Sequence, residues 1–82
     1  MRRFYFHLKS AGELVPDDEG LELPSLNEAK REALQGAREL LAEAIKAGSP
    51  KVHEALIIAD EAGRTLHELP LVEVLPEPLK VK

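Results

Sequence analysis

All three aromatic side chains of this chain, Phe4, Tyr5 and Phe6, occupy consecutive positions near its start. Because successive side chains of a β-strand point to opposite faces, a strand over residues 3–9 places Phe4, Phe6 and Leu8 on one face. The opposite face then carries four amphipathic or charged side chains, Arg3, Tyr5, His7 and Lys9. The pattern predicts a strand with one face in the core and the other face polar and weakly basic.

The composition is that of one small domain. A chain of 82 residues buries only about 60–65% of its unfolded surface on folding, so we expect modest stability, which self-association would raise. No stretch approaches membrane-spanning length, and the apolar run after Arg2 and Arg3 is too short for a secretory signal. The chain has no cysteine, which excludes disulfides, thiolate zinc sites and thiol nucleophiles and makes the cytoplasm the expected location.

The charge balance bears on possible partners. The chain has 11 Lys and Arg residues against 15 Asp and Glu residues, a formal net charge of −4. Such a chain does not attract nucleic acid as a whole, so binding to nucleic acid would need a local basic patch.

The pattern of residues 10–24 predicts a turn and the second strand of a hairpin. Ser10-Ala11-Gly12 is a turn-forming cluster, and the apolar pair Leu14-Val15 follows it. Pro16 cannot donate a backbone hydrogen bond and residues 17–20 are typical of a turn, so we expect a short or interrupted strand at a sheet edge. Residues 21–23 are the candidate for its continuation, and Pro24 ends the segment.

A capping box predicts the start of a long helix. In Ser25-Leu26-Asn27-Glu28 the hydroxyl and carboxylate satisfy each other's free backbone donors. Apolar residues then recur at steps of three and four to form one stripe: Leu26, Ala29, Ala33, Leu34, Ala37, Leu40, Leu41, Ala44 and Ile45. Gly48 and Pro50 end the helix after about 22 residues.

The helix is expected to pack on the sheet through this stripe. Its larger members, Leu34, Leu40 and Leu41, are the predicted partners of Phe4 and Phe6. Gly36 lies within the helix and is expected to let it approach the sheet closely.

The rest of the chain predicts a second hairpin. Residues 52–59 contain the run Leu56-Ile57-Ile58, which is typical of a buried strand, and 60–63 are turn residues. Residues 64–74 continue as a fourth strand, in which Pro70 must lie at an edge or a bulge. The prediction is therefore an α+β domain, ββαββ, with one long helix on a largely antiparallel four-stranded sheet of order 2-1-3-4. Residues 1–74 form this domain, and 75–82 form an extended or disordered tail.

Several short elements together resemble a known family. They are Arg3-Phe4-Tyr5-Phe6-His7-Leu8, Asp17-Asp18-Glu19-Gly20 with Leu23-Pro24, the alanine-rich helix, and Ala59-Asp60-Glu61-Ala62-Gly63. The chain resembles, from about residue 3 to about residue 73, a family of short bacterial proteins of unknown function. The resemblance implies a single domain of bacterial origin and assigns no activity, cofactor or catalytic residue.

Residues capable of chemistry are present but scattered. Asp17, Asp18 and Glu19 lack the alternating ligand pattern of a calcium loop and are typical of a solvated turn. His53 and His67 lack the spacing of a zinc pair. Ser10, Ser25 and Ser49 fit a turn, a helix cap and a helix end, and the glycines form no phosphate-binding loop. We predict no catalytic residue, cofactor or metal ion and no enzymatic activity.

Three classes of function remain as hypotheses. The first is a non-enzymatic interaction module that binds a protein partner, or a second copy of itself, through the uncovered sheet face or an edge strand. The candidate interaction surface is Arg3, Tyr5, His7 and Lys9. The alternative is weak binding of single-stranded nucleic acid on the same face, with Tyr5 stacking a base and Arg2, Arg3, Lys9 and Arg64 near phosphates. The third is a small hydrolase or metal enzyme built on His7 and residues 17–19.

Overall fold

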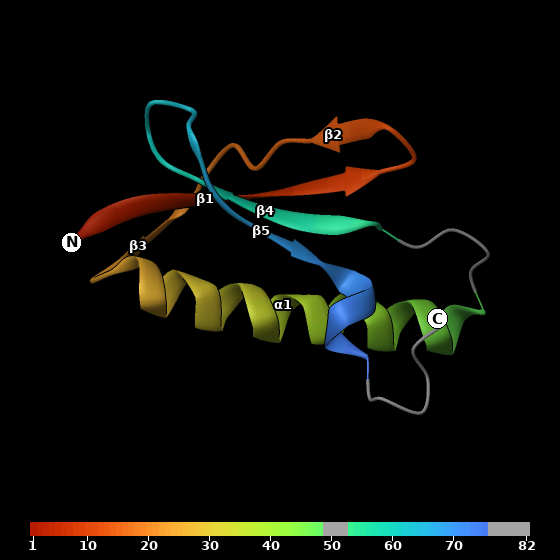
Figure 1. Ribbon diagram of the computed structural model, residues 1–82. Helices are drawn as coiled ribbons and strands as arrows, with labels where there is room; N and C mark the ends of the chain where they lie inside the picture. Colours follow the sequence, from red (N-terminus) through yellow and green to blue (C-terminus); the bar gives the residue numbers. More distant parts are fainter. Residues whose placement is uncertain (49–52, 76–82) are drawn as a thin grey trace.

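The computed structural model of the chain describes residues 1–48 and 53–75. One helix lies along one face of an antiparallel sheet, which confirms the α+β prediction (Figure 1). In chain order the elements are β1 (Arg2–Ser10), β2 (Glu13–Val15), β3 (Leu21–Leu23), α1 (Leu26–Ala47), β4 (Ala55–Ala59), β5 (Thr65–Pro70) and the 3₁₀ helix η1 (Leu71–Val74).

The first strand is the centre of the sheet. It pairs with β4 on one side and with both β2 and β3 on the other, while β5 lies beyond β4. The expected order is observed, but the expected second strand is two strands, so the sheet has five. The register explains the break. Leu8 is opposite Val15 and Phe4 is opposite Leu21, so three residues of β1 (5–7) face five residues (16–20), which cannot all stay in the ladder.

A tight turn joins β1 to β2. Ser10 and Glu13 are paired, and the two residues between them, Ala11 and Gly12, have φ angles of 47° and 82°. Two consecutive positive φ values are typical of a type I′ turn, whose twist matches that of the strands it connects. The expected hairpin is confirmed.

The last strand is shorter than the sequence predicts. It ends at Pro70, and residues 71–74 form η1 instead of continuing the strand. The Leu71 N–H donates to the Glu54 carbonyl (2.9 Å), so the preceding backbone nitrogen, that of Pro70, faces away from β4. Proline therefore removes no hydrogen bond of the ladder, and it leaves the outer edge of β5 with one donor fewer. β4 begins at Ala55, and position 52 lies outside the described residues.

Both predicted ends of the helix are confirmed. The Ser25 hydroxyl accepts a hydrogen bond from the Glu28 N–H (3.3 Å). The expected return bond to the Glu28 carboxylate is not among the described contacts, and that carboxylate pairs with Arg31 instead. At the other end Gly48 has a φ of 62°, and its N–H donates to the Ile45 carbonyl (3.2 Å). The helix is therefore delimited by local signals at both ends.

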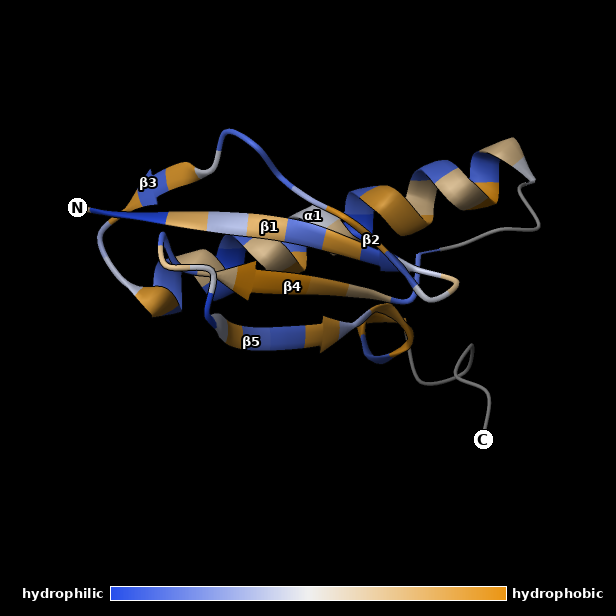
Figure 2. Ribbon diagram, turned by 90° about the horizontal axis from the view of Figure 1, so that it is seen from above, coloured by the Kyte–Doolittle hydropathy of each residue, from blue (hydrophilic) through white to orange (hydrophobic). Residues whose placement is uncertain are grey.

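The core differs from the prediction in which helix residues it buries. Phe4 is fully buried, and Phe6 and Leu8 pack against the core, as alternation along β1 predicts. The three fully buried residues of α1 are alanines (Ala29, Ala33 and Ala37). The predicted partners Leu34, Leu40 and Leu41 are only partly buried, and of these Leu40 and Leu41 pack against the core. Small side chains let the helix backbone approach the sheet, where Phe4 and residues of β4 fill the space between the layers. β4 is the most uniformly hydrophobic strand (Figure 2).

Two further expectations concern the helix and the tail. A Cβ at Gly36 would lie 3.9 Å from Leu56 Cδ1, an ordinary contact, so close packing does not require glycine there. Of the expected tail, residues 76–82 lie outside the described residues. Within residues 1–48 and 53–75, no helix is long and apolar enough to cross a bilayer.

Candidate interaction surface

Residues 16–20, here called the acidic loop, run beside the middle of β1. Asp17 lies where β1 has neither β2 nor β3 as a neighbour, and its Oδ2 accepts a hydrogen bond from the Phe6 N–H (3.1 Å). A carboxylate oxygen thus replaces the backbone carbonyl that a continuous strand would supply. The break in the sheet therefore leaves no unpaired donor at Phe6.

The other oxygen of the same carboxylate shapes the acidic loop. Asp17 Oδ1 accepts from the backbone N–H groups of Glu19 (3.2 Å) and Gly20 (3.3 Å). Burial raises the pKa of the Asp17 carboxyl, but three backbone N–H donors and the nearby His7 ring outweigh it. The pKa therefore lies below its ordinary value of 3.8, and Asp17 is an anion near neutral pH.

His7 holds the loop from the side of β1. Its Nδ1 accepts a hydrogen bond from the Asp17 N–H (2.9 Å). The imidazole also stacks with Tyr5, with ring centroids 6.4 Å apart and planes inclined by 18°. Both side chains are half-buried.

The end of the loop packs tightly on β1. Gly20 has a φ of 72°, and a Cβ there would lie 2.9 Å from the Phe4 carbonyl oxygen and 3.0 Å from Tyr5 Cε2. Only glycine fits this conformation and this space. Arg3 adds two contacts: its guanidinium donates to the Glu19 carbonyl (2.7 Å) and pairs with the Glu22 carboxylate (3.3 Å).

The structure thus brings together three of the four residues of the predicted surface. Arg3 and His7 bind the acidic loop or β3, and Tyr5 lies between His7 and Gly20. Lys9 lies further along β1, opposite Leu14 and Ala55. The face of β1 that α1 does not cover is therefore partly covered by the acidic loop.

A different surface lies on the edge formed by β2 and β3. Three aliphatic side chains along this edge are exposed to solvent, Leu14 (53%) on the face of Lys9, and Val15 (49%) and Leu21 (43%) on the face of Leu8 and Phe4, and we call them the apolar edge. Figure 2 shows hydrophobic and hydrophilic residues alternating along β3. An edge strand with exposed aliphatic side chains is a natural site for association.

The same segment is strongly acidic. Residues 11–29 contain six carboxylates and no Lys, Arg or His: Glu13, Asp17, Asp18, Glu19, Glu22 and Glu28. Glu22 pairs with Arg3, and Glu28 pairs with Arg31 (3.6 Å). Glu13, Asp18 and Glu19 are exposed. A count of charges in a sliding window would have revealed this segment from the sequence, but the apolar edge follows only from the pairing of β2 and β3 with β1.

The remaining histidines do not form a cluster. Ser10 Oγ and His53 Nδ1 are 2.6 Å apart, a bond that joins the end of β1 to a residue just before β4. His67 lies on β5 opposite Ile58. Within the part of the chain that the structure describes, no three His, Cys, Asp or Glu residues lie close enough together to hold a metal ion.

A second apolar region lies between α1 and η1. It is a groove of about 770 Å³, lined mainly by aliphatic residues that include Leu41, Leu71 and Leu75. Ile45 (69% exposed) and Val72 (48% exposed) also line it. Because both the groove and the apolar edge expose aliphatic side chains, substitutions in each can show which of the two surfaces binds a partner.

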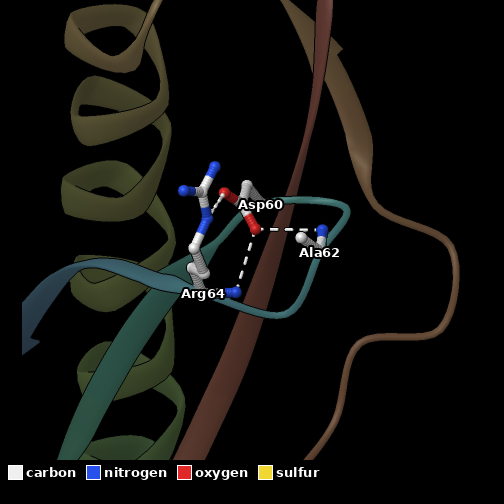
Figure 3. A network of polar contacts seen from close by, with 3 residues as sticks. All are labelled: Asp60, Ala62 and Arg64. Carbon is white, nitrogen blue, oxygen red and sulfur yellow. Dashed lines mark hydrogen bonds and ion pairs between the residues drawn. The ribbon is translucent and has the colours of Figure 1, made fainter.

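The turn between β4 and β5 is built on a single carboxylate. Asp60 is 9% exposed; its Oδ1 accepts from the N–H groups of Ala62 (3.0 Å) and Arg64 (2.9 Å), and its Oδ2 accepts from Arg64 Nε (2.9 Å) (Figure 3). The Arg64 N–H and guanidinium hold the pKa of Asp60 below its ordinary value, although burial acts in the opposite direction. Asp60 thus fixes both the turn and the Arg64 side chain.

Comparison with known proteins identifies a family. A family model described as "Domain of unknown function (DUF6894)" matches residues 3–72, a range that includes α1, β2 to β5 and all of β1 except Arg2. No curated protein and no solved structure gives a match. Since the family model covers well over half of the sequence, the chain belongs to the DUF6894 family, a domain of unknown function.

Proposed function

We propose that this chain is a non-enzymatic interaction module that binds a protein partner at the apolar edge. The observation that carries the proposal is the exposure of Leu14, Val15 and Leu21 on one edge of the sheet. Aliphatic groups in this position lose unfavourable contact with water when a partner covers them. The neighbouring backbone groups of β2 and β3 offer hydrogen bonds to an added strand.

The other two surfaces in the first hypothesis fit less well. On the uncovered face of β1, polar groups of Arg3 and His7 already bind the acidic loop or β3. The outer edge of β5 is interrupted by the outward-facing nitrogen of Pro70. The apolar edge is thus the best candidate among the sheet surfaces of that hypothesis, and the α1–η1 groove is the alternative that the test below separates from it.

Charge indicates the chemistry of the partner. Glu13, Asp18 and Glu19 are exposed beside the apolar edge, and no basic residue occurs between positions 11 and 29. A second copy docking edge to edge would bring like charges together, which is unfavourable. The proposed occupant is therefore a segment of another protein that presents aliphatic side chains flanked by Lys or Arg.

The proposal is tested by affinity capture from native lysate with three forms of the chain: the native chain, the double variant L14K/V15K, and the control I45K in the α1–η1 groove. Any captured protein is then purified and titrated directly. We expect L14K/V15K to weaken its binding by about tenfold or more, with I45K unchanged and affinity falling as salt rises. A partner that binds both variants equally, or a dimer of the chain that L14K/V15K abolishes, would contradict the proposal.

We further propose that the module acts in the cytoplasm. The composition supports this location, because a chain without cysteine needs no oxidising compartment to fold. Fractionation of native cells with an antibody to the chain checks it, and recovery in a secreted or membrane fraction would contradict it.

A further inference from the structure

A small recess lies at one end of the sheet, where the start of β1 meets the β4–β5 turn. Its volume is about 250 Å³, and its lining residues are Arg2, Arg3, Asp60, Glu61, Ala62 and Arg64. Three of these six residues are arginines, although the chain as a whole has a net charge of −4. The recess is separate from the apolar edge and requires its own explanation.

Arg64 is held in place but keeps unused donors. Its Nε binds Asp60 Oδ2, whereas its side chain is 79% exposed. Figure 3 shows the contact between Nε and the Asp60 carboxylate; among the described residues, no hydrogen bond joins the other two guanidinium nitrogens to a protein group. They are therefore available to an acceptor from outside the chain.

Asp60 does not block the recess to an anion. Its two oxygens together accept three hydrogen bonds, all from its own turn, and it is nearly buried. The carboxylate therefore acts as an internal anchor that orients the Arg64 fork. Glu61 is exposed and is the one lining carboxylate without such a role among the described contacts.

Arg2 supplies a second guanidinium, to which no hydrogen bond is made within residues 1–48 and 53–75. Its Cζ lies 5.1 Å from the centre of the Phe4 ring, so the buried ring fixes the position of the cation through its face. A cation–π contact leaves the N–H groups at the rim of the guanidinium unbound. Arg3 already donates to the Glu19 carbonyl and the Glu22 carboxylate, so it contributes charge to the recess.

We propose that this recess binds a phosphate group, either as a phosphate ester or as the free ion, with Arg2 and Arg64 as its ligands. Guanidinium groups match the geometry of phosphate oxygens and form short, charge-assisted hydrogen bonds with them. Both side chains are oriented before binding, one by Phe4 and one by Asp60, which lowers the entropy lost on binding. The proposal is independent of the interaction at the apolar edge.

The test is a titration of the full chain followed by NMR, observing the arginine Nε–Hε signals and the Ala62 amide. The probes are inorganic phosphate and glycerol 3-phosphate, each compared with sodium chloride at equal ionic strength. We expect saturable shifts at Arg2, Arg64 and Ala62 with phosphate and none with chloride. Tighter binding of glycerol 3-phosphate supports an ester as the source of the phosphate, and equal or tighter binding of inorganic phosphate supports the free ion.

Variants with matched charge complete the test. We expect R2Q, which leaves the Asp60 turn intact, to weaken phosphate binding by about tenfold, and R64K, which keeps the charge but loses the fork, to do likewise. R38Q removes one positive charge from the exposed surface of α1 and should leave binding unchanged. Shifts that do not saturate, or an equal loss of affinity in R2Q and R38Q, would overturn the proposal.

Discussion

Asp17 shows how one side chain can replace a missing stretch of strand. Its carboxylate accepts the Phe6 N–H that β2 and β3 leave unpaired and caps two N–H groups of the acidic loop, while its own N–H is bound by His7. The sequence indicates a turn at these residues. It does not show that the turn folds back on β1, because that contact joins positions 10 or 11 residues apart and depends on the register of two strands.

Replacing Asp17 should therefore destabilise the fold. In D17N an amide nitrogen replaces one of the two carboxylate oxygens. Because both oxygens accept backbone N–H groups, at least one of these N–H groups loses its acceptor. We expect a loss of about 1–3 kcal/mol in the free energy of unfolding, measured by urea denaturation at neutral pH. D18N removes the same charge from an exposed neighbour and should change stability far less. Equal effects of the two variants would show that charge, and not the hydrogen bonds, matters at Asp17.

The same residue predicts part of the acid sensitivity. The pKa of Asp17 is lower in the folded chain than its ordinary value of 3.8, so the unfolded state takes up the proton first as pH falls. The stabilisation that the Asp17 anion contributes is complete above the ordinary pKa of 3.8, and it is lost as pH falls through the pKa of Asp17 in the folded chain. The stability difference between the native chain and D17N should therefore narrow below pH 3.8 in denaturation curves recorded across the acid range. A difference that is constant with pH would contradict this account.

Gly20 is the residue at which the loop has the least freedom. In G20A a methyl group would meet the Phe4 carbonyl oxygen at 2.9 Å while the backbone keeps a positive φ. We expect a loss of about 2 kcal/mol or more, measured by thermal unfolding. G12A is the control: Gly12 also has a positive φ (82°), but a Cβ there meets nothing within 4 Å, so it reports the backbone strain alone. Equal losses in the two variants would contradict the close packing of the loop on β1.

At the scale of elements, the structure follows the sequence wherever the signal is local. The capping box at Ser25, the glycine at position 48 and the alternation along β1 define the helix ends and the buried face of the central strand correctly. The predictions are wrong where the structure depends on how the helix and the sheet pack together. The helix buries alanines because the layers lie close together, and the last strand stops at Pro70 because the chain turns there into η1. The periodicity of apolar residues indicates neither the distance between the helix and the sheet nor the point at which a strand turns away.

The helix contains a site where stability can be gained. Gly36 lies inside α1 with an ordinary φ, and an added Cβ would make only an ordinary contact with Leu56 at 3.9 Å. We expect G36A to raise the free energy of unfolding by about 0.5–1 kcal/mol, because alanine has the higher helix propensity. Urea denaturation of G36A beside the native chain measures the change. A decrease in stability would show that the helix packs more tightly on the sheet than the structure indicates.

At the scale of the whole molecule, the surface is divided by chemistry. The edge formed by β2 and β3 is aliphatic and acidic, and the recess at the start of β1 is rich in arginine. The uncovered face of β1, which the sequence singles out through Arg3, Tyr5, His7 and Lys9, is partly covered by the acidic loop. Both proposed sites depend on contacts between β1 and distant segments, which is why a reading of residues in order does not find them.

Hydrogen exchange of the chain with and without its captured partner tests the central claim most directly, because it shows which edge is covered. Binding at the apolar edge predicts new protection of backbone amides in β2 and β3 (residues 13–15 and 21–23), with β5 and the α1–η1 groove unchanged. Protection confined to β5 or to the groove, with β2 and β3 exchanging as in the free chain, would contradict it.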